Sequence, residues 1–167
     1  RQNEVCQQCH LQGKARILLE GQRWDAYEAS TPLGEFTSIL VPKNDDGPDF
    51  GIASHGYRLN LSACGRVGKA TCTDCHNPHR TPSREAYVTA CQKCHAQDST
   101  QACSKPGEHV GYCPSCHLHK GGTSDIPHVR FTDHYIRIRP KQKLNEKTTE
   151  VKELVDDLTR KEEADPT

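Results

Sequence analysis

Four short segments of the chain repeat one arrangement of cysteine and histidine, with two cysteines three positions apart and a histidine directly after the second. Thiols at this spacing can bond the two vinyl groups of one porphyrin, and the following imidazole then lies beneath the iron as its proximal ligand. The pattern therefore predicts four covalently bound haem c groups. We number the segments motifs 1 to 4: Cys6-Gln-Gln-Cys9-His10, Cys72-Thr-Asp-Cys75-His76, Cys91-Gln-Lys-Cys94-His95 and Cys113-Pro-Ser-Cys116-His117.

Two other chemistries use pairs of cysteines at this spacing. Pairs of C-x-x-C segments form four-thiolate zinc sites, and single pairs serve as redox-active dithiols. Neither chemistry requires a histidine after every second cysteine, and all four copies have one. The sequence therefore favours haem over zinc.

The second axial ligand of each iron must come from outside the motifs. The chain has ten histidines and no methionine, so a methionine ligand is excluded. We expect two histidine ligands at most or all of the irons, while five-coordinate iron and Lys or Tyr ligands remain open. His119, two positions after a proximal histidine, is poorly placed. The candidate second ligands are His55, His79, His128, His134 and His109.

Two cysteines, Cys64 and Cys103, lie outside the motifs. Attachment of haem c takes place on the oxidising side of a membrane, where a disulfide is permitted. We therefore expect a Cys64–Cys103 disulfide, and the alternative is two unrelated buried thiols.

The composition limits the class of protein. Only 33% of the 167 residues are hydrophobic and 5% aromatic, which is little material for a core unless large apolar cofactors supply the rest. The 22 basic and 22 acidic residues balance, with no basic stripe that would bind nucleic acid. No apolar run approaches a transmembrane segment, and no signal-peptide pattern opens the sequence. We expect an exported, periplasmic or extracellular protein whose signal peptide is absent or removed.

The expected fold is mainly α with much irregular structure, organised compactly around four closely packed haems, plus a C-terminal helix. Residues 1–140 form the predicted tetrahaem domain, in which 21–63 is a long connector and 135–139 a short strand. Residues 141–167 form a charged tail, and the apolar spacing in it predicts an amphipathic helix over 148–161.

Motifs 2, 3 and 4 begin at positions 72, 91 and 113, so about twenty residues separate each from the next. So little protein cannot insulate the haems from one another, and the spacing predicts closely coupled redox centres. We therefore expect an electron carrier rather than an enzyme, serving redox partner proteins. It could act alone, with copies of itself, or within a larger respiratory or photosynthetic complex. The alternative is an oxidoreductase that acts on a small nitrogen or sulfur compound at one five-coordinate haem.

Several segments resemble one known family. The chain is similar to the multihaem cytochrome domain of bacterial proteins that carry tetratricopeptide repeats, and more distantly to small tetrahaem cytochromes and multihaem nitrite and hydroxylamine enzymes. The resemblance implies an exported protein in which His55, His79, His128 and His134 are associated with haem. The matching segments are His55-Gly-Tyr-Arg-Leu-Asn, Thr71-Cys-Thr-Asp-Cys-His-Asn-Pro-His79, motif 4, Asp125-Ile-Pro-His128 and Thr132-Asp-His134-Tyr-Ile-Arg.

Overall fold

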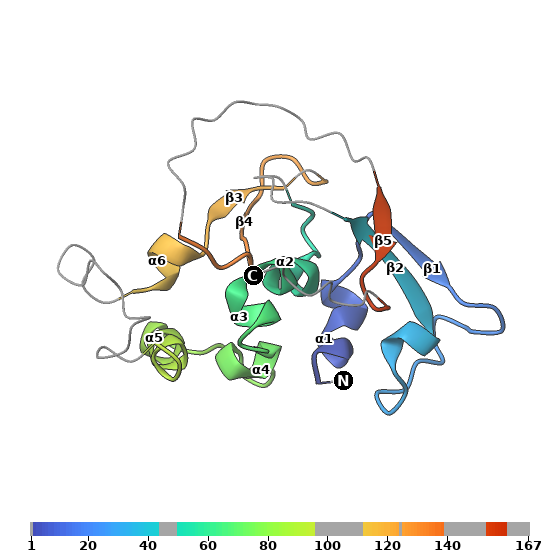
Figure 1. Ribbon diagram of the computed structural model, residues 1–167, viewed down its shortest axis with the longest axis horizontal. Helices are drawn as coiled ribbons and strands as arrows, with labels where there is room; N and C mark the ends of the chain where they lie inside the picture. The colour runs from blue at the N-terminus through green and yellow to red at the C-terminus, as the bar shows by residue number, and fades with distance from the viewer. Residues whose placement is uncertain (1, 44–49, 96–111, 124, 139–152, 160–167) are drawn as a thin grey trace.

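The computed structural model describes residues 2–43, 50–95, 112–123, 125–138 and 153–159 (Figure 1). Of these residues, 33% are helical and about 19% lie in strands that form two small antiparallel sheets. The chain is therefore mixed α/β, and the expectation of a mainly α fold is wrong. In the part of the chain that the structure describes, no helix is long and apolar enough to cross a bilayer.

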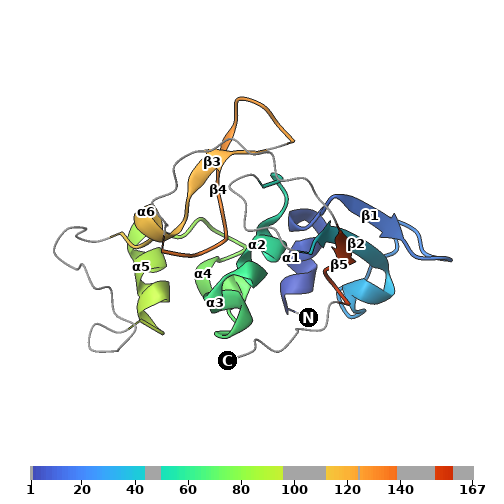
Figure 2. The ribbon, with the colours of Figure 1, turned by 45° about the horizontal axis from the view of Figure 1, so that its top comes forward.

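The helices are short and lie mostly at or between the cysteine motifs. They are α1 (Gln2–His10), the 3-10 helix η1 (Leu33–Glu35), α2 (His55–Leu61), α3 (Ala63–Arg66), α4 (Cys72–Cys75), α5 (Arg84–Gln92) and α6 (Pro114–His117). The strands are β1 (Ala15–Leu18), β2 (Thr37–Pro42), β3 (Lys120–Gly122), β4 (Arg130–Thr132) and β5 (Leu154–Asp156). The three-stranded sheet and the helices α5 and α6 lie at opposite ends of the molecule, with α1 to α4 between them (Figures 1 and 2).

Strand β2 is the centre of the three-stranded sheet, with β1 and β5 antiparallel on either side. Alternate β2 residues point inward because successive side chains of a strand face opposite sides, and Thr37, Ile39 and Val41 are buried. Ile39 and Val41 form the core with Leu11, Leu33 and Tyr57, so the core lies between the sheet and helices α1 and α2.

Two segments differ from their predicted structure because long-range pairing overrides local pattern. The connector predicted over 21–63 contains β2, the central strand. The strand predicted over 135–139 is displaced, since the chain pairs at Arg130–Thr132 with Lys120–Gly122 instead. Sheet pairing depends on the partner strand, which a local reading of apolar alternation does not include.

The predicted helix over 148–161 is also wrong where the structure describes it, because Leu154–Asp156 form strand β5 on the edge of β2. The Asp156 carboxylate accepts hydrogen bonds from the Ser38 hydroxyl at 2.7 Å, the Ile39 N–H at 3.3 Å and the Leu158 N–H at 3.0 Å. One acidic side chain thus ties this segment to the central strand. The predicted 141–167 tail otherwise falls largely outside the described residues.

Replacing Asp156 by alanine should lower the free energy of unfolding by about 1–3 kcal/mol, because the Ile39 and Leu158 N–H groups lose their acceptor. Chemical unfolding followed by circular dichroism measures the change. The control is Asp25→Ala, which breaks an exposed pair with Arg23 and should cost less than about 1 kcal/mol. Equal costs for the two variants would contradict the docking of β5.

Candidate functional site

The cysteine motifs lie on short helices with identifiable start signals. The helix of motif 2 is capped by Thr71, whose N–H and hydroxyl both donate to the Asp74 carboxylate, at 2.7 and 2.9 Å. This capping arrangement satisfies N-terminal donors of α4 and fixes the turn that carries Cys72 and Cys75. Helix α5 starts at Ser83, whose hydroxyl accepts from the Ala86 N–H, and it carries the first cysteine of motif 3.

Motifs 1 and 2 lie in direct contact although more than sixty residues separate them. The Asn3 side-chain oxygen accepts a hydrogen bond from the Cys72 N–H at 2.8 Å, and Gln2 donates to Thr73. The Cys6 thiol also lies close enough to Cys72 to raise the pKa of Cys72. Helices α1 and α4 therefore present their cysteines to the same region.

Contacts continue from motif 2 to motifs 3 and 4. The Tyr87 hydroxyl lies 3.4 Å from His76 Nδ1, which joins α5 to the end of motif 2. The Cys91 thiol lies close enough to Cys113 for that thiol to raise its pKa, so motifs 3 and 4 are also neighbours. The spatial order of the four motifs is thus their order along the chain.

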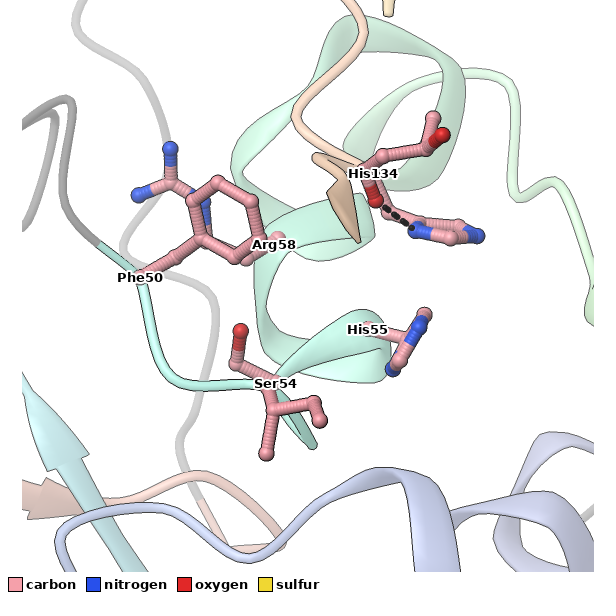
Figure 3. A pocket seen from close by; sticks show the side chains of 7 residues that line it. Phe50, Ser54, His55, Arg58 and His134 are labelled. Carbon is pink, nitrogen blue, oxygen red and sulfur yellow. Dashed lines mark hydrogen bonds between the residues drawn. The ribbon is translucent and has the colours of Figure 1, made fainter. Parts of the chain in front are cut away.

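Two motif histidines gather with two of the predicted second ligands. The His10 and His55 rings have centroids 5.0 Å apart, His55 and His134 are 4.4 Å apart, and His76 and His134 are 6.0 Å apart. Figure 3 shows His55 on α2 and His134 on the segment that follows β4, with both side chains on the same side of α2. These residues come from four parts of the chain, so the fold assembles them.

A buried ion pair holds the two elements that carry His55 and His134. Arg58 follows His55 by one helical turn, and Asp133 directly precedes His134. Arg58 Nε and Nη2 donate to the two Asp133 oxygens at 2.9 and 2.6 Å, and both side chains are 1% exposed. The Arg58 guanidinium also lies 5.6 Å from the Phe50 ring centroid and 5.3 Å from that of Tyr135.

Close packing of α1 against α2 brings His55 to His10. A Cβ at Gly56 would lie 2.7 Å from the Gln7 side-chain nitrogen and 3.0 Å from its Cγ. Gln7 is buried in the middle of motif 1, so its amide has little freedom to move aside. Only glycine leaves room here for the two helices to approach at this distance.

Burial favours the neutral form of three of the clustered histidines, His55, His76 and His134. Burial, together with the neighbouring His134, His10 and His76, lowers the pKa of His55 to about 4. Burial also lowers the pKa of His134 and of His76 below the ordinary value. A neutral imidazole keeps the lone pair that a metal ligand needs.

Hydrogen bonds orient His134, and one nitrogen of His55 is left unsatisfied. His134 Nδ1 lies 3.1 Å from the Thr132 carbonyl oxygen, which only accepts, so Nδ1 carries the proton and Nε2 keeps its lone pair. A hydrogen bond from one ring nitrogen to a carbonyl oxygen is typical of metal-binding histidines. His55 Nδ1 is buried and has no hydrogen-bond partner among the described residues.

Cys72 and Cys91 differ from the cysteines of redox-active dithiols, whose thiol pKa values are lowered. Burial raises the pKa of Cys72 to about 11, with a further contribution from Cys6. Burial likewise raises the pKa of Cys91 to about 11. These thiols are therefore protonated at neutral pH.

The remaining predicted site residues lie apart from the four-histidine cluster or outside the description. His79 is exposed, in a tight turn where its N–H donates to the Asn77 side chain at 2.9 Å. His128 is exposed and has a left-handed backbone, with φ of 64°. His95 is exposed and His117 half-buried, each at the end of its motif. His109 and Cys103, and with Cys103 the predicted disulfide, lie outside the described residues.

The cavity beside the cluster is too small for a porphyrin. It lies between Phe50, His55, Arg58 and His134 (Figure 3) and encloses no space that would hold even a water molecule, whereas ligand pockets usually exceed roughly 300 Å³. Within the described ranges, no three or more histidine, cysteine or acidic side chains converge to hold a metal ion. Whether the residues fit haem is therefore judged from the thiols and histidines present and from how many apolar side chains are buried around the motifs.

Among the described residues, the side of the molecule that carries motifs 2 to 4 has no buried apolar side chain. All eight buried hydrophobic side chains of the described residues lie between positions 11 and 59. Helices α4, α5 and α6 bury none of their residues, and Val67, just before motif 2, is 79% exposed. Thiols, histidines and uncovered apolar surface in one region are a donor set and an environment that fit covalently bound haem.

Arg58, Asp133 and Gly56 are functional candidates that the motif search missed. The signal that could have indicated the ion pair is an arginine one helical turn after one candidate ligand, His55, together with an acidic residue next to another, His134. The distance that separates them in sequence, 75 residues, hides the pairing from local patterns.

No family model matches the chain, and neither a curated protein nor a solved structure matches it.

Replacing Arg58 by methionine should lower the free energy of unfolding by about 3–5 kcal/mol, because Asp133 is left as an uncompensated buried charge. Arg58→Met with Asp133→Leu should recover much of that loss, because a well-packed apolar pair has no charge to desolvate. Chemical unfolding measures both variants. Arg23→Met, at an exposed pair, is the matched control. A cost at Arg58 no larger than at Arg23 would contradict the buried pair.

The chain prepared without haem should be cut by a protease within residues 67–123 much faster than within 2–61, because the first range has no buried apolar side chains in its described part. The protein matured with haem should resist cleavage in both ranges. Timed digestion with mass spectrometry of the fragments distinguishes the two states. Equal protection of both ranges in the haem-free chain would mean that the motif region has a core without the cofactor.

Proposed function

We propose that this chain is a tetrahaem c-type cytochrome that transfers electrons between redox partner proteins in the periplasm or outside the cell. The eight motif cysteines hold the porphyrins, and His10, His76, His95 and His117 are proximal ligands of iron. When bound, the haems supply the one-electron chemistry. The chain's own residues fix the order, spacing and exposure of the four centres.

The observation that carries this proposal is the succession of the motifs in space. Motif 1 lies beside motif 2, where the Asn3 side chain of α1 accepts a hydrogen bond from the Cys72 N–H. Motif 3 lies beside motif 4, where Cys113 is close enough to Cys91 to raise its pKa. Between these pairs, Cys75 is close enough to Cys91 to influence its pKa. Four redox centres attached to such a succession would form a continuous relay, which suits conduction better than chemistry at one isolated centre.

The neutral histidines beside motifs 1 and 2 support two histidine ligands at those irons. A methionine ligand raises the potential of a haem relative to histidine, and the chain has no methionine. The proposal therefore includes low potentials and low-spin iron. It also leaves the carrier free to act alone, with copies of itself, or as a subunit of a larger respiratory or photosynthetic complex.

The matured protein should contain four haems per chain by the pyridine haemochrome assay, and all four ferric irons should be low-spin by electron paramagnetic resonance. Stoichiometric zinc in place of haem would refute the cytochrome proposal. One equivalent of high-spin iron that shifts with nitrite, hydroxylamine or cyanide would instead support an oxidoreductase with an open iron position.

Replacing Cys91 and Cys94 by serine should reduce the haem content from four to three per chain, because motif 3 loses both attachment thiols. Cys64→Ser is the matched control, since Cys64 lies near Cys75 and Cys94 but outside the motifs, and it should keep four haems. Haemochrome content and the mass of the intact chain measure the difference. A loss of haem in the control as well would contradict attachment by the motif alone.

A further inference from the structure

The ring separations within the four-histidine cluster indicate which two histidines could bind the same iron and which bind different irons. We infer that His55 is the second axial ligand of the haem carried by motif 1, opposite His10. By the same geometry, His134 is the second ligand of the haem carried by motif 2, opposite His76. This inference rests on the proposed function, since it assigns ligands to haems that the function requires.

Two imidazoles on opposite sides of one metal ion have a defined separation. Each bound nitrogen lies about 2 Å from the metal, so the two ring centroids lie roughly 6 Å apart. His76 and His134 meet this condition, with centroids 6.0 Å apart and ring planes inclined by only 30°. His134 Nδ1 donates to Thr132 and leaves Nε2 free, while the Tyr87 hydroxyl lies beside Nδ1 of His76. Each ring of this pair therefore has one nitrogen engaged by the protein and the other available for iron.

His55 and His134 cannot be opposite ligands of one iron. Their centroids are 4.4 Å apart and their planes are inclined by 67°, which leaves no room for a metal and a porphyrin between them. They must therefore serve different irons.

His10 is the partner that remains for His55. Their centroids are 5.0 Å apart, so iron between them would require the rings to separate by roughly 1 Å to reach two bonds of about 2 Å. His10 is exposed at the last residue of α1, where such a movement meets little resistance. Among the described histidines, no ring contact joins His10 to His134 or His55 to His76, which the crossed assignment would need.

The assignment gives the first two centres a short link. Because His55 and His134 touch, the second ligands of the two irons would be in van der Waals contact. The Arg58–Asp133 pair maintains that contact from one side, since its two residues adjoin the two ligands. Electrons would pass between motifs 1 and 2 without crossing an intervening side chain.

The decisive experiment counts high-spin iron in paired variants of the complete chain. His10→Gly, His55→Gly and His134→Gly should each produce one high-spin equivalent by electron paramagnetic resonance. His10→Gly combined with His55→Gly should still produce one equivalent, because both changes affect one iron. His10→Gly combined with His134→Gly is the matched control and should produce two. The haem content of every sample is measured first, so that loss of the cofactor, which would count against the proposed function, is separated from loss of a ligand.

The opposite result, two equivalents for the first combination and one for the second, would establish the crossed assignment and overturn the inference. Low-spin iron throughout in His55→Gly would also overturn it, because His55 would then bind no iron.

Where a proximal variant fails to mature, backgrounds with three haems give the same information. In Cys6→Ser/Cys9→Ser, which lacks the first haem, His55→Gly should add no high-spin iron, whereas in Cys72→Ser/Cys75→Ser it should add one equivalent. His134→Gly should behave in the reverse manner. An added equivalent from His55→Gly in the first background would refute the assignment.

Discussion

The buried ion pair between Arg58 and Asp133 is the constraint on which the arrangement of the histidines depends. Both side chains are almost fully removed from water, a position in which either charge alone would be strongly unfavourable. Their two hydrogen bonds are satisfied only when helix α2 and the segment after β4 meet in one register. His55 and His134 adjoin the pair, so the requirement to satisfy two charges also fixes the separation of two imidazoles. An apolar contact would tolerate sliding that this pair does not.

Packing of α2 against α1 and the sheet also fixes the position of motif 1 relative to His55. The core of Leu11, Ile39, Val41 and Tyr57 fixes α1 and α2 against the three-stranded sheet, and the Tyr57 hydroxyl donates to the Pro42 carbonyl at 2.8 Å. Gly56 then allows α2 to approach α1 closely, because it leaves room for the Gln7 side chain of α1. Helix α2 therefore contacts three parts of the structure: the sheet through Tyr57, motif 1 at Gly56, and the segment of His134 through Arg58. Motif 1 is consequently held against the apolar core, through Leu11 and helix α2.

The local motifs could be recognised in the sequence, and long-range pairing could not. The motifs are complete within five residues each, and His55 and His134 could be selected as candidate ligands because few other residues could serve. The edge strand β5 could not be recognised, since Val155 and Leu158 fit a helical period equally well and only pairing with β2 decides between the two structures. The ion pair was missed for the same reason, because nothing near Arg58 in the sequence indicates Asp133.

The uneven distribution of the core connects the fold to the proposed cofactor. The sheet, α1 and α2 bury enough apolar surface to order themselves, but α4, α5 and α6 bury none. A segment that cannot bury apolar groups has little to offset the conformational entropy lost on ordering. Porphyrins bonded to its cysteines would provide that apolar surface where the sequence omits it. The low hydrophobic content and the four motifs would then have one explanation, in which the apolar core orders motif 1 and the cofactors would order motifs 2 to 4.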